Sequence, residues 1–480
     1  MNQKKLEQFI KNEKRRFDGA QPLDNEAWIV QDTNINTDIQ NSLLTLRARS
    51  NYLAKNSPWG ERVVAAFKNN VVGTGIEPQI TTGSKNLDKS IEDKLKEDMQ
   101  TLDITGTQHF FDLQGLCVEN MVTDGESFSR WVIEKGQLKQ QFLETHQIDS
   151  LAFTNKKSGN TINMGVEVNK TGRPIGYHIN DLDFDFFSVN SGHDSKFIPY
   201  SDMLHIFIKK KSSQLRGIPW FSPVLVKFRH LDKAFDAELI AMRVAACFSV
   251  LLQLEDSESD EENEDASDFY QRVQHLVPGL ISKIGKNENA TIVDPKRPNA
   301  NFIAFTEGML RAIAAGFGIA YETISRDFTK ANFGNIRASL IDERKYYRIL
   351  QRFIIRNYCN PTVKEIINFG RLTGRYPRAN IKIDWQANGF EWVDPLKDTK
   401  AAIDEANNNL NTKKAIVMAK GRNWEDIIEQ RKKEIEQELE LLKMQKEVNK
   451  IKKELDNEDI EPNKDDEKEQ GTDNEGTTDK

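Results

Sequence analysis

Three aspartates alternate along one stretch of the chain, at Asp181, Asp183 and Asp185. In a strand, residues two apart share a face, so the three carboxylates would point the same way. Carboxylate oxygens are ligands that Mg²⁺ prefers, and a magnesium site of this kind would serve phosphoryl chemistry on DNA. An exposed sheet edge or turn explains the alternation as well, and we prefer that interpretation. A metal-dependent DNA-processing enzyme therefore stays as an alternative.

Other catalytic patterns are missing from the sequence. Cys117, Cys247 and Cys359 lie far apart, and no two histidines stand three to five residues apart, so a zinc site is not expected. The Gly-x-Ser-x-Gly, kinase and P-loop patterns are absent. The cysteines resemble buried thiols of a protein made in a reducing compartment. We predict no catalytic residue, no metal and no cofactor, and therefore no enzyme.

Two further features have a structural and a functional interpretation. Gly73 and Gly75 could cradle a phosphate, but no third glycine follows and Pro78 blocks the expected helix, which favours a turn. His205 lies in the apolar run of residues 204–208, where a hydrogen-bonded core histidine is preferred over a ligand.

Composition describes a large, polar chain with uneven charge. It has 480 residues, 38% of them hydrophobic and 29% charged, a mean hydropathy of -0.63 and a net charge of -7. Residues 456–480 sum to -8 and residues 255–265 carry eight acids, which leaves a body of +9. No apolar run of about 18 residues exists, so no transmembrane helix and no membrane partner are expected. The first residues lack the apolar segment of a secretory signal.

The elements that must position these residues mix helices and strands. Apolar residues recur at helical spacing from Leu43 to Asn70, and residues 221–253 carry one continuous helical seam. A helix of that length would span about 50 Å, and its alanines suit close packing against copies of itself, although burial in a large domain is the alternative. The other predicted helices cover residues 110–123, 307–317, 335–358 (stopped before Pro361) and 424–455; the predicted strands cover residues 128–133, 165–168, 175–179, 204–208, 277–282, 290–293 and part of 381–395. This is an α+β pattern.

The last predicted helix, residues 424–455, carries two apolar stripes that are out of phase. Ile428, Ile435, Leu439 and Leu442 form one stripe; Leu441, Met444, Val448, Ile451 and Leu455 form the other. The change of phase argues against a long coiled coil and favours a solvated amphipathic helix.

An ordered set of short motifs resembles the portal proteins of the lambda family of tailed bacteriophages, from about residue 40 to residue 435. Each motif is weak alone, but their order is specific. They are residues 46–50 with Arg47, residues 69–75, 165–167 and 172–174, His205, residues 214–223 with Arg216 and Gly217, residues 310–318, the loop with Asp327, Asn332 and Arg337, and residues 392–395.

The resemblance implies a homo-oligomeric ring, typically of twelve subunits, at one vertex of the phage capsid. Double-stranded DNA would pass through its channel during packaging and ejection. The partners implied are the terminase large subunit, head–tail connector or adaptor proteins, and the major capsid or scaffold protein. The protein would be made in the bacterial cytoplasm and located in the virion. A capsid scaffold or adaptor without a channel is the second alternative.

The resemblance also implies a portal-protein fold with wing, helical stem, clip and crown, assembled as a ring. Laid on this chain, it gives a flexible N-terminal arm (1–40), an α+β wing (41–220), a long stem helix (221–253), a clip (254–306), a second stem helix (307–324), a tunnel loop (325–334), a crown and returning wing segment (335–435), a charged amphipathic helix (436–455) and a disordered acidic tail (456–480).

Site residues follow from this layout. Lys330, Arg326 and Arg337 are the candidates to face the channel and its DNA, and Arg326 could instead pair with Asp327 or another neighbour. The candidates for docking terminase and connector proteins are acidic residues of the clip: Glu255, Asp256, Asp260, Glu261 and Glu262.

Overall fold

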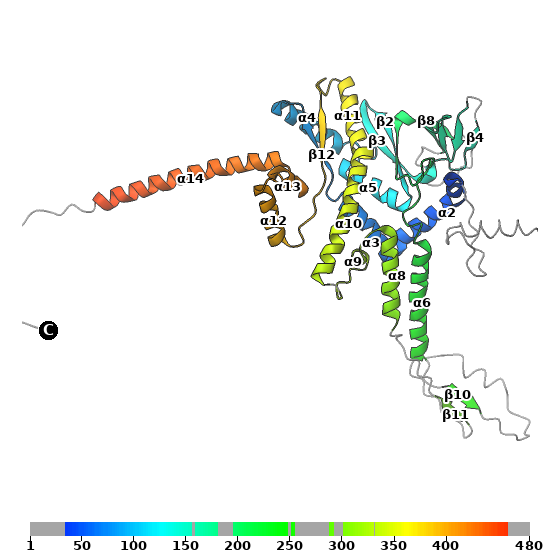
Figure 1. The fold of residues 1–480 in the computed structure, drawn as a ribbon. Helices are drawn as coiled ribbons and strands as arrows, with labels where there is room; N and C mark the ends of the chain where they lie inside the picture. Colours follow the sequence, from blue (N-terminus) through cyan, green and yellow to red (C-terminus); the bar gives the residue numbers. More distant parts are fainter. Residues whose placement is uncertain are drawn as a thin grey trace, which may run out of the picture. The chain divides into compact units, whose positions relative to one another are not determined.

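The computed structural model describes residues 34–155, 159–180, 195–247, 251–254, 288–291, 301–330 and 332–458. The chain forms two compact units, Met1–Asn388 (unit 1) and Gly389–Lys480 (unit 2). Unit 1 contains all four sheets of the described chain together with helices that pack on them (Figure 1). The predicted α+β class is confirmed.

Unit 1 begins with two helices joined by a tight break, α2 (Ile35–Asn56) and α3 (Pro58–Val71). Asn34 caps α2 by accepting a hydrogen bond from the backbone N–H of Asn36. The helix therefore starts within the predicted arm of residues 1–40, and the arm was predicted too long. The start of α2 is polar because the helix buries only a narrow stripe of side chains. Its first residue is therefore set by the cap at Asn34, which an apolar period does not reveal.

A two-stranded sheet joins distant parts of unit 1. β1 (Glu77–Thr81) pairs antiparallel with β12 (Lys382–Gln386), and α4 (Lys85–Gln100) contacts β1. Between α3 and β1, Asn388 donates a hydrogen bond from its side-chain amide to the carbonyl of Val72 at 2.6 Å. The interpretation of the Gly73 and Gly75 segment as a turn is confirmed.

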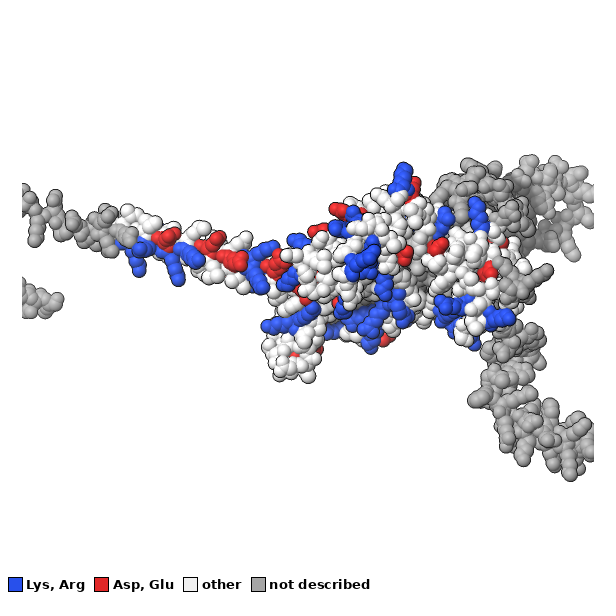
Figure 2. Space-filling view, turned by 90° about the horizontal axis from the view of Figure 1, so that it is seen from above, with Lys and Arg blue, Asp and Glu red and all other residues white. Residues whose placement is uncertain are grey.

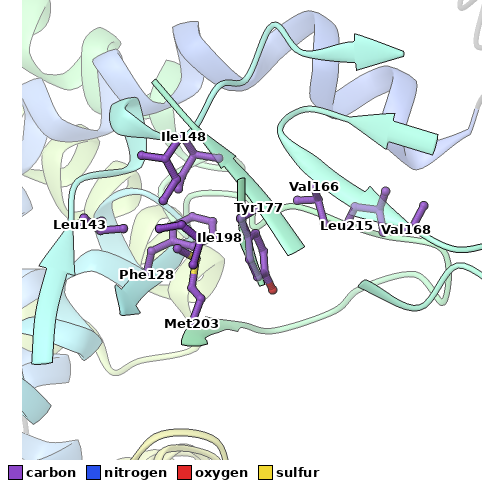
Figure 3. Close-up of a cluster of buried hydrophobic side chains, with 10 residues drawn as sticks. Phe128, Leu143, Ile148, Val166, Val168, Tyr177, Ile198, Met203 and Leu215 are labelled. Atoms are coloured by element: carbon purple, nitrogen blue, oxygen red, sulfur yellow. The ribbon is translucent and has the colours of Figure 1, made fainter. Parts of the chain in front are cut away.

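The two larger sheets share a buried apolar cluster. α5 (Phe110–Thr123) leads into a three-stranded sheet in the order β3-β2-β9, and a five-stranded antiparallel sheet has the order β4-β5-β6-β7-β8. Figure 3 shows apolar side chains of both sheets gathered in one buried cluster. The strands are β2 (Glu126–Glu134), β3 (Gln137–Leu143), β4 (Phe153–Asn155), β5 (Thr161–Asn163), β6 (Val166–Val168), β7 (Pro174–Ile179), β8 (Lys196–Pro199) and β9 (Met203–Phe207).

Two helices, α6 (Leu225–Cys247) and α8 (Phe302–Phe317), lie side by side (Figure 1). The predicted helix of residues 221–253 ends early, because β10 (Leu251–Leu254) pairs antiparallel with β11 (Glu288–Thr291). Leucines at 251, 252 and 254 fit a helical seam and a strand equally well, and only the ladder with a segment far along the chain decides between them. The predicted strand of residues 277–282 lies outside the described residues.

A long helical segment follows α8 and α9 (Tyr321–Ser325). α10 (Phe333–Ile354) continues through a π-helical turn (Ile355–Cys359) into α11 (Asn360–Leu372). The prediction that this helix stops before Pro361 was wrong. Proline lacks an N–H group, and the wider π turn changes the hydrogen-bond register just before it, so the helix continues.

Unit 2 is helical, with α12 (Pro395–Asn407), α13 (Lys413–Ala419) and α14 (Trp424–Glu458). Asp394 and Thr412 cap α12 and α13 through their side-chain oxygens. None of residues 389–453 is buried. Figure 2 shows Lys and Arg side chains alternating with Asp and Glu along α14. Across the described part of the chain, no helix is long and apolar enough to span a membrane.

Candidate functional site

A buried carboxylate lies where four elements of unit 1 meet. Glu126 is the first residue of β2 and its side chain is 0% exposed. Gly125, just before it, has a positive φ of 86°, and a Cβ there would come within 2.2 Å of the Ile218 backbone. Only glycine fits this turn, because it must bring β2 against the segment around Ile218.

Two arginines from distant parts of the chain reach Glu126. Arg47, on α2, donates from Nη2 to Oε1 of Glu126. Arg216, in the segment after β9, donates from Nε to the same oxygen at 2.9 Å, and the backbone N–H of Gly217 donates to Oε2 at 2.7 Å. Both arginine side chains are buried, so the cluster crosslinks α2, β2 and the segment before α6.

His205, on β9, completes the cluster. Its Nε2 lies 2.8 Å from Oε2 of Glu126, and its ring stacks on Phe128 with the ring centroids 4.1 Å apart. The interpretation of His205 as a hydrogen-bonded core histidine is confirmed. Burial lowers the pKa of His205, against the opposing pull of its hydrogen bond to Glu126.

The electrostatics keep the carboxylate charged. Burial by itself would raise the pKa of Glu126, but the Arg216 and Arg47 guanidinium groups and His205 hold that pKa well below its usual range. Burial lowers the pKa of Arg47 to about 10. Burial also raises the pKa of the neighbouring Asp124, which accepts hydrogen bonds from Asn51 and Thr145.

The arrangement serves structure and not proton transfer. An ionised carboxylate has about four acceptor sites, and Glu126 uses them for Arg47, Arg216, His205 and Gly217. No lone pair is left to act on a substrate, and the cluster is closed to solvent. We therefore interpret it as a brace, called here the Glu126 brace.

The brace also explains several motifs of the sequence. Arg47, His205, Arg216 and Gly217 all belong to the motifs noted there, and the fold brings them together on Glu126. Glu126 itself was missed. A charged residue at the start of a strand is the signal that could have found it, because a buried carboxylate requires cationic partners.

The three channel candidates lie on different elements. Lys330 follows α9 and donates from Nζ to Glu307 on α8 at 2.6 Å, while its side chain stays 68% exposed. Arg326 is exposed at the end of α9, with a left-handed φ of 56°. Arg337 is half-buried on α10.

The loop around these residues is ordered by Asp327. Its carboxylate accepts hydrogen bonds from the Thr329 hydroxyl at 2.6 Å and the Thr329 N–H at 3.0 Å, and these bonds lower the pKa of Asp327. The positive charge of Arg326 adds to burial in lowering the pKa of Arg62 on α3.

The remaining candidates lie outside the described residues. These are the aspartates Asp181, Asp183 and Asp185 and the acidic docking candidates of residues 255–262. Within the described ranges, no group of three or more His, Cys, Asp or Glu side chains could hold a metal ion.

A family model described as phage portal protein, lambda family, matches residues 22–351. That match covers more than half of the sequence. The chain belongs to the lambda family of phage portal proteins, as the motifs around the Glu126 brace had indicated.

Two phage relatives agree with this membership. The chain is 27% identical over 413 residues to a probable portal protein of Halomonas phage phiHAP-1, covering 80% of this chain and 79% of the relative. It is 19% identical over 452 residues to portal protein B of Escherichia phage lambda, covering 81% and 82%. Among solved structures it is similar to a chain in the neck of an empty gene transfer agent particle, with 13% identity, a TM-score of 0.46, and coverage of 82% of this chain and 95% of that one.

Proposed function

We propose that copies of this chain form the ring-shaped channel at a unique capsid vertex of a phage, through which double-stranded DNA is packaged and ejected. The proposal rests on membership of the portal family, and we take twelve copies as the expected number. The observation that carries it is the pair of helices α6 and α8, called here the stem hairpin.

The stem hairpin is held together by aromatic contacts along its length. Phe235 on α6 packs edge-on against Phe302 on α8, with the ring centroids 5.0 Å apart. Nearer its base, Phe228 meets Phe317 at 6.4 Å, and Gly316 lets Val224 approach so closely that a Cβ would lie 2.2 Å from it. The hairpin therefore has a defined internal face and can act as a stiff wall element.

The stem hairpin also exposes large apolar side chains. Several large side chains there are between 47% and 67% exposed, which is costly for helices that face water. A ring in which each hairpin packs against its neighbours would bury them. These side chains are Val226, Leu239 and Ile240 on α6, and Ile303 and Phe305 on α8.

The ring is tested with Ile240→Asp, which places a charge on the outer face of α6. We expect wild-type protein to give hollow rings by native mass spectrometry and negative-stain microscopy, and the variant to stay monomeric with an unchanged circular dichroism spectrum. Leu372→Asp, at an exposed position at the end of α11, is the matched control and should still form rings. Wild-type protein that stays monomeric or dimeric under capsid-assembly conditions contradicts the proposal.

Lys330 is proposed to face the DNA in the channel, with Arg326 and Arg337 as further candidates. Its positive charge is balanced by the carboxylate of Glu307, 2.6 Å from Nζ. This balance supports a channel that binds DNA weakly, because each contact of an unpaired lysine with a DNA phosphate would add salt-dependent affinity. Lys330→Ala should leave the ring intact but alter DNA packaging or retention. Glu307→Gln leaves the charge of Lys330 unbalanced. It should therefore change DNA retention in the direction opposite to Lys330→Ala and make that retention depend more strongly on salt. Unchanged retention in both variants at all salt concentrations contradicts this role.

Docking of terminase, and later of connector proteins, is proposed for the acidic clip segment with Glu255, Asp256, Asp260, Glu261 and Glu262. Family membership supports this proposal, as it supports contact with the capsid or scaffold protein and location in the virion. Deletion of residues 255–265 should weaken terminase binding without unfolding the protein.

Truncation of residues 456–480, which are too polar to bury apolar surface, should leave the ring intact.

A further inference from the structure

Helix α14 carries apolar side chains on two opposite sides, at different positions along its length. At 3.6 residues per turn, Ile435, Leu439 and Leu442 fall on the same side of α14 as Ile428. A second stripe, called here the upper stripe, begins at Leu441 on the far side. The lower side is exposed as well, with Ile435, Leu439 and Leu442 between 43% and 52% exposed, and the two sides differ in the spacing of their residues.

The upper stripe has the spacing of a short coiled-coil seam. Its five residues follow the alternating three-and-four spacing of heptad positions a and d, over about 21 Å of helix. All are between 52% and 61% exposed. Taken in the order a, d, a, d, a, they are Leu441, Met444, Val448, Ile451 and Leu455.

The charges beside the upper stripe select an orientation for a second helix. The g positions are acidic, at Glu440, Glu447 and Glu454, and the e positions are Gln445 and Lys452. In a parallel, in-register pair, each g residue faces the e residue of the next heptad, so that Glu447 meets Lys452 and Glu440 meets Gln445. An antiparallel pair would set acidic g residues against each other.

We infer that the upper stripe of α14 packs against the upper stripe of α14 from another copy of this chain, parallel and in register. This inference rests on the proposed ring. Helices that run along a rotation axis are parallel to one another, which is the orientation that the charges favour. Two heptads are too short for a stable pair in isolation, but within a ring the effective concentration of neighbouring helices reaches the millimolar range.

Cysteine crosslinking of the full-length protein tests the contact. A disulfide needs Cα atoms within about 7 Å, so Val448→Cys should link to the same residue of a second copy when rings are treated with diamide. Lys446→Cys, two residues away on the opposite side of α14, is the matched control, and the native cysteines are common to both variants. We expect covalent dimers of Val448→Cys to form at least about tenfold faster than those of Lys446→Cys.

A charge exchange tests the orientation. Added to Val448→Cys, Glu447→Lys should slow crosslinking because it sets lysine against Lys452, and the further change Lys452→Glu should restore the rate. Rescue by the double exchange is expected only for parallel helices.

Microscopy of the same samples separates this inference from the proposed ring. Rings in which both cysteine variants crosslink equally slowly, or in which the double exchange does not rescue, overturn the inference and leave the ring standing. Fast, selective crosslinking without rings supports the inference and contradicts the proposed function. Absence of both rings and crosslinks contradicts both.

Discussion

Every residue described as buried lies in unit 1, whereas residues 389–453 of unit 2 contain none. Unit 1 has aromatic residues such as Phe67 and Phe110 at 0% exposure and the Glu126 brace between its elements. Unit 2 is supported by helix caps and by surface ion pairs such as that of Lys414 with Glu425, and pairs of this kind contribute little to stability. The difference predicts that unit 1 is the more stable of the two units, because unit 2 lacks a buried core among its described residues.

The largest expected effect is therefore a difference in local stability between the two units. In the unassembled chain, amide hydrogens of α5 should be protected by about 5 kcal/mol more than those of α12 and α13, because short helices without a buried face open easily. Hydrogen exchange read by mass spectrometry measures this. Assembly into rings should raise the protection of unit 2. Equal protection of both units in the monomer would show that their local stabilities do not differ.

The Glu126 brace should dominate the stability of unit 1. Glu126→Gln leaves Arg47 and Arg216 buried without a carboxylate, which should cost about 3–5 kcal/mol in the free energy of unfolding. Chemical denaturation measures it. Glu429→Gln on α14 removes the exposed pair with Lys433 and serves as the control, with no measurable change expected. A similar, small effect in both variants would show that the brace contributes no more than a surface pair.

The brace should also make unit 1 sensitive to acid. The pKa of His205 is lowered by burial, so below about pH 6.5 the unfolded chain binds a proton there that the folded chain does not, and stability falls. The pKa of Glu126 is held below its usual value by Arg216 and Arg47, against the effect of burial, so a second loss follows as the pH falls below about 4.3. Denaturation of unit 1 across this range should show both losses, and His205→Gln should remove only the first. A flat profile from pH 7 to pH 5 contradicts the role of His205.

Two helix glycines give the smallest expected effects, with opposite signs. A Cβ on Gly60 would lie 2.2 Å from the carbonyl oxygen of Leu53, so Gly60→Ala should destabilise the packing of α2 on α3 by about 1–3 kcal/mol. Gly308 on α8 has open space around it, so Gly308→Ala should stabilise the unassembled chain by about 0.5–1 kcal/mol. Thermal denaturation of both variants provides the measurement, and a loss for Gly308→Ala would show that α8 is packed more tightly than its neighbours indicate.

Much of the fold could be predicted because periodicity is local. The strands around Phe128, Tyr177 and His205 and the helices of residues 110–123 and 424–455 were predicted within a few residues of their observed bounds. α4 was missed, because its charged sequence buries only Ile91, Leu95 and Met99. The continuation of the helix through Pro361 was missed for a different reason. Proline usually interrupts a helix, but the π turn before Pro361 removes that effect.

The candidate site could be predicted only in part. Arg47, His205 and Arg216 were noted as members of motifs, but their common partner was not found. Lys330 was predicted to face the channel, and its ion pair with Glu307 was not expected. A charged side chain shows its type in the sequence, but its partner depends on which segments the fold brings within hydrogen-bond distance.

The sequence by itself determined the α+β class, the helical periods of the stem hairpin and α14, the upper stripe with its flanking charges, and the family motifs. Each of these depends on residue types at short, fixed spacings. Only the tertiary structure decided that Arg47 and Arg216, 79 and 90 residues from Glu126, share one carboxylate. It also decided that Leu251–Leu254 pairs as a strand. Such contacts are fixed by the packing of distant segments, because burying a charge or completing a ladder is favourable only when the partner is already in place.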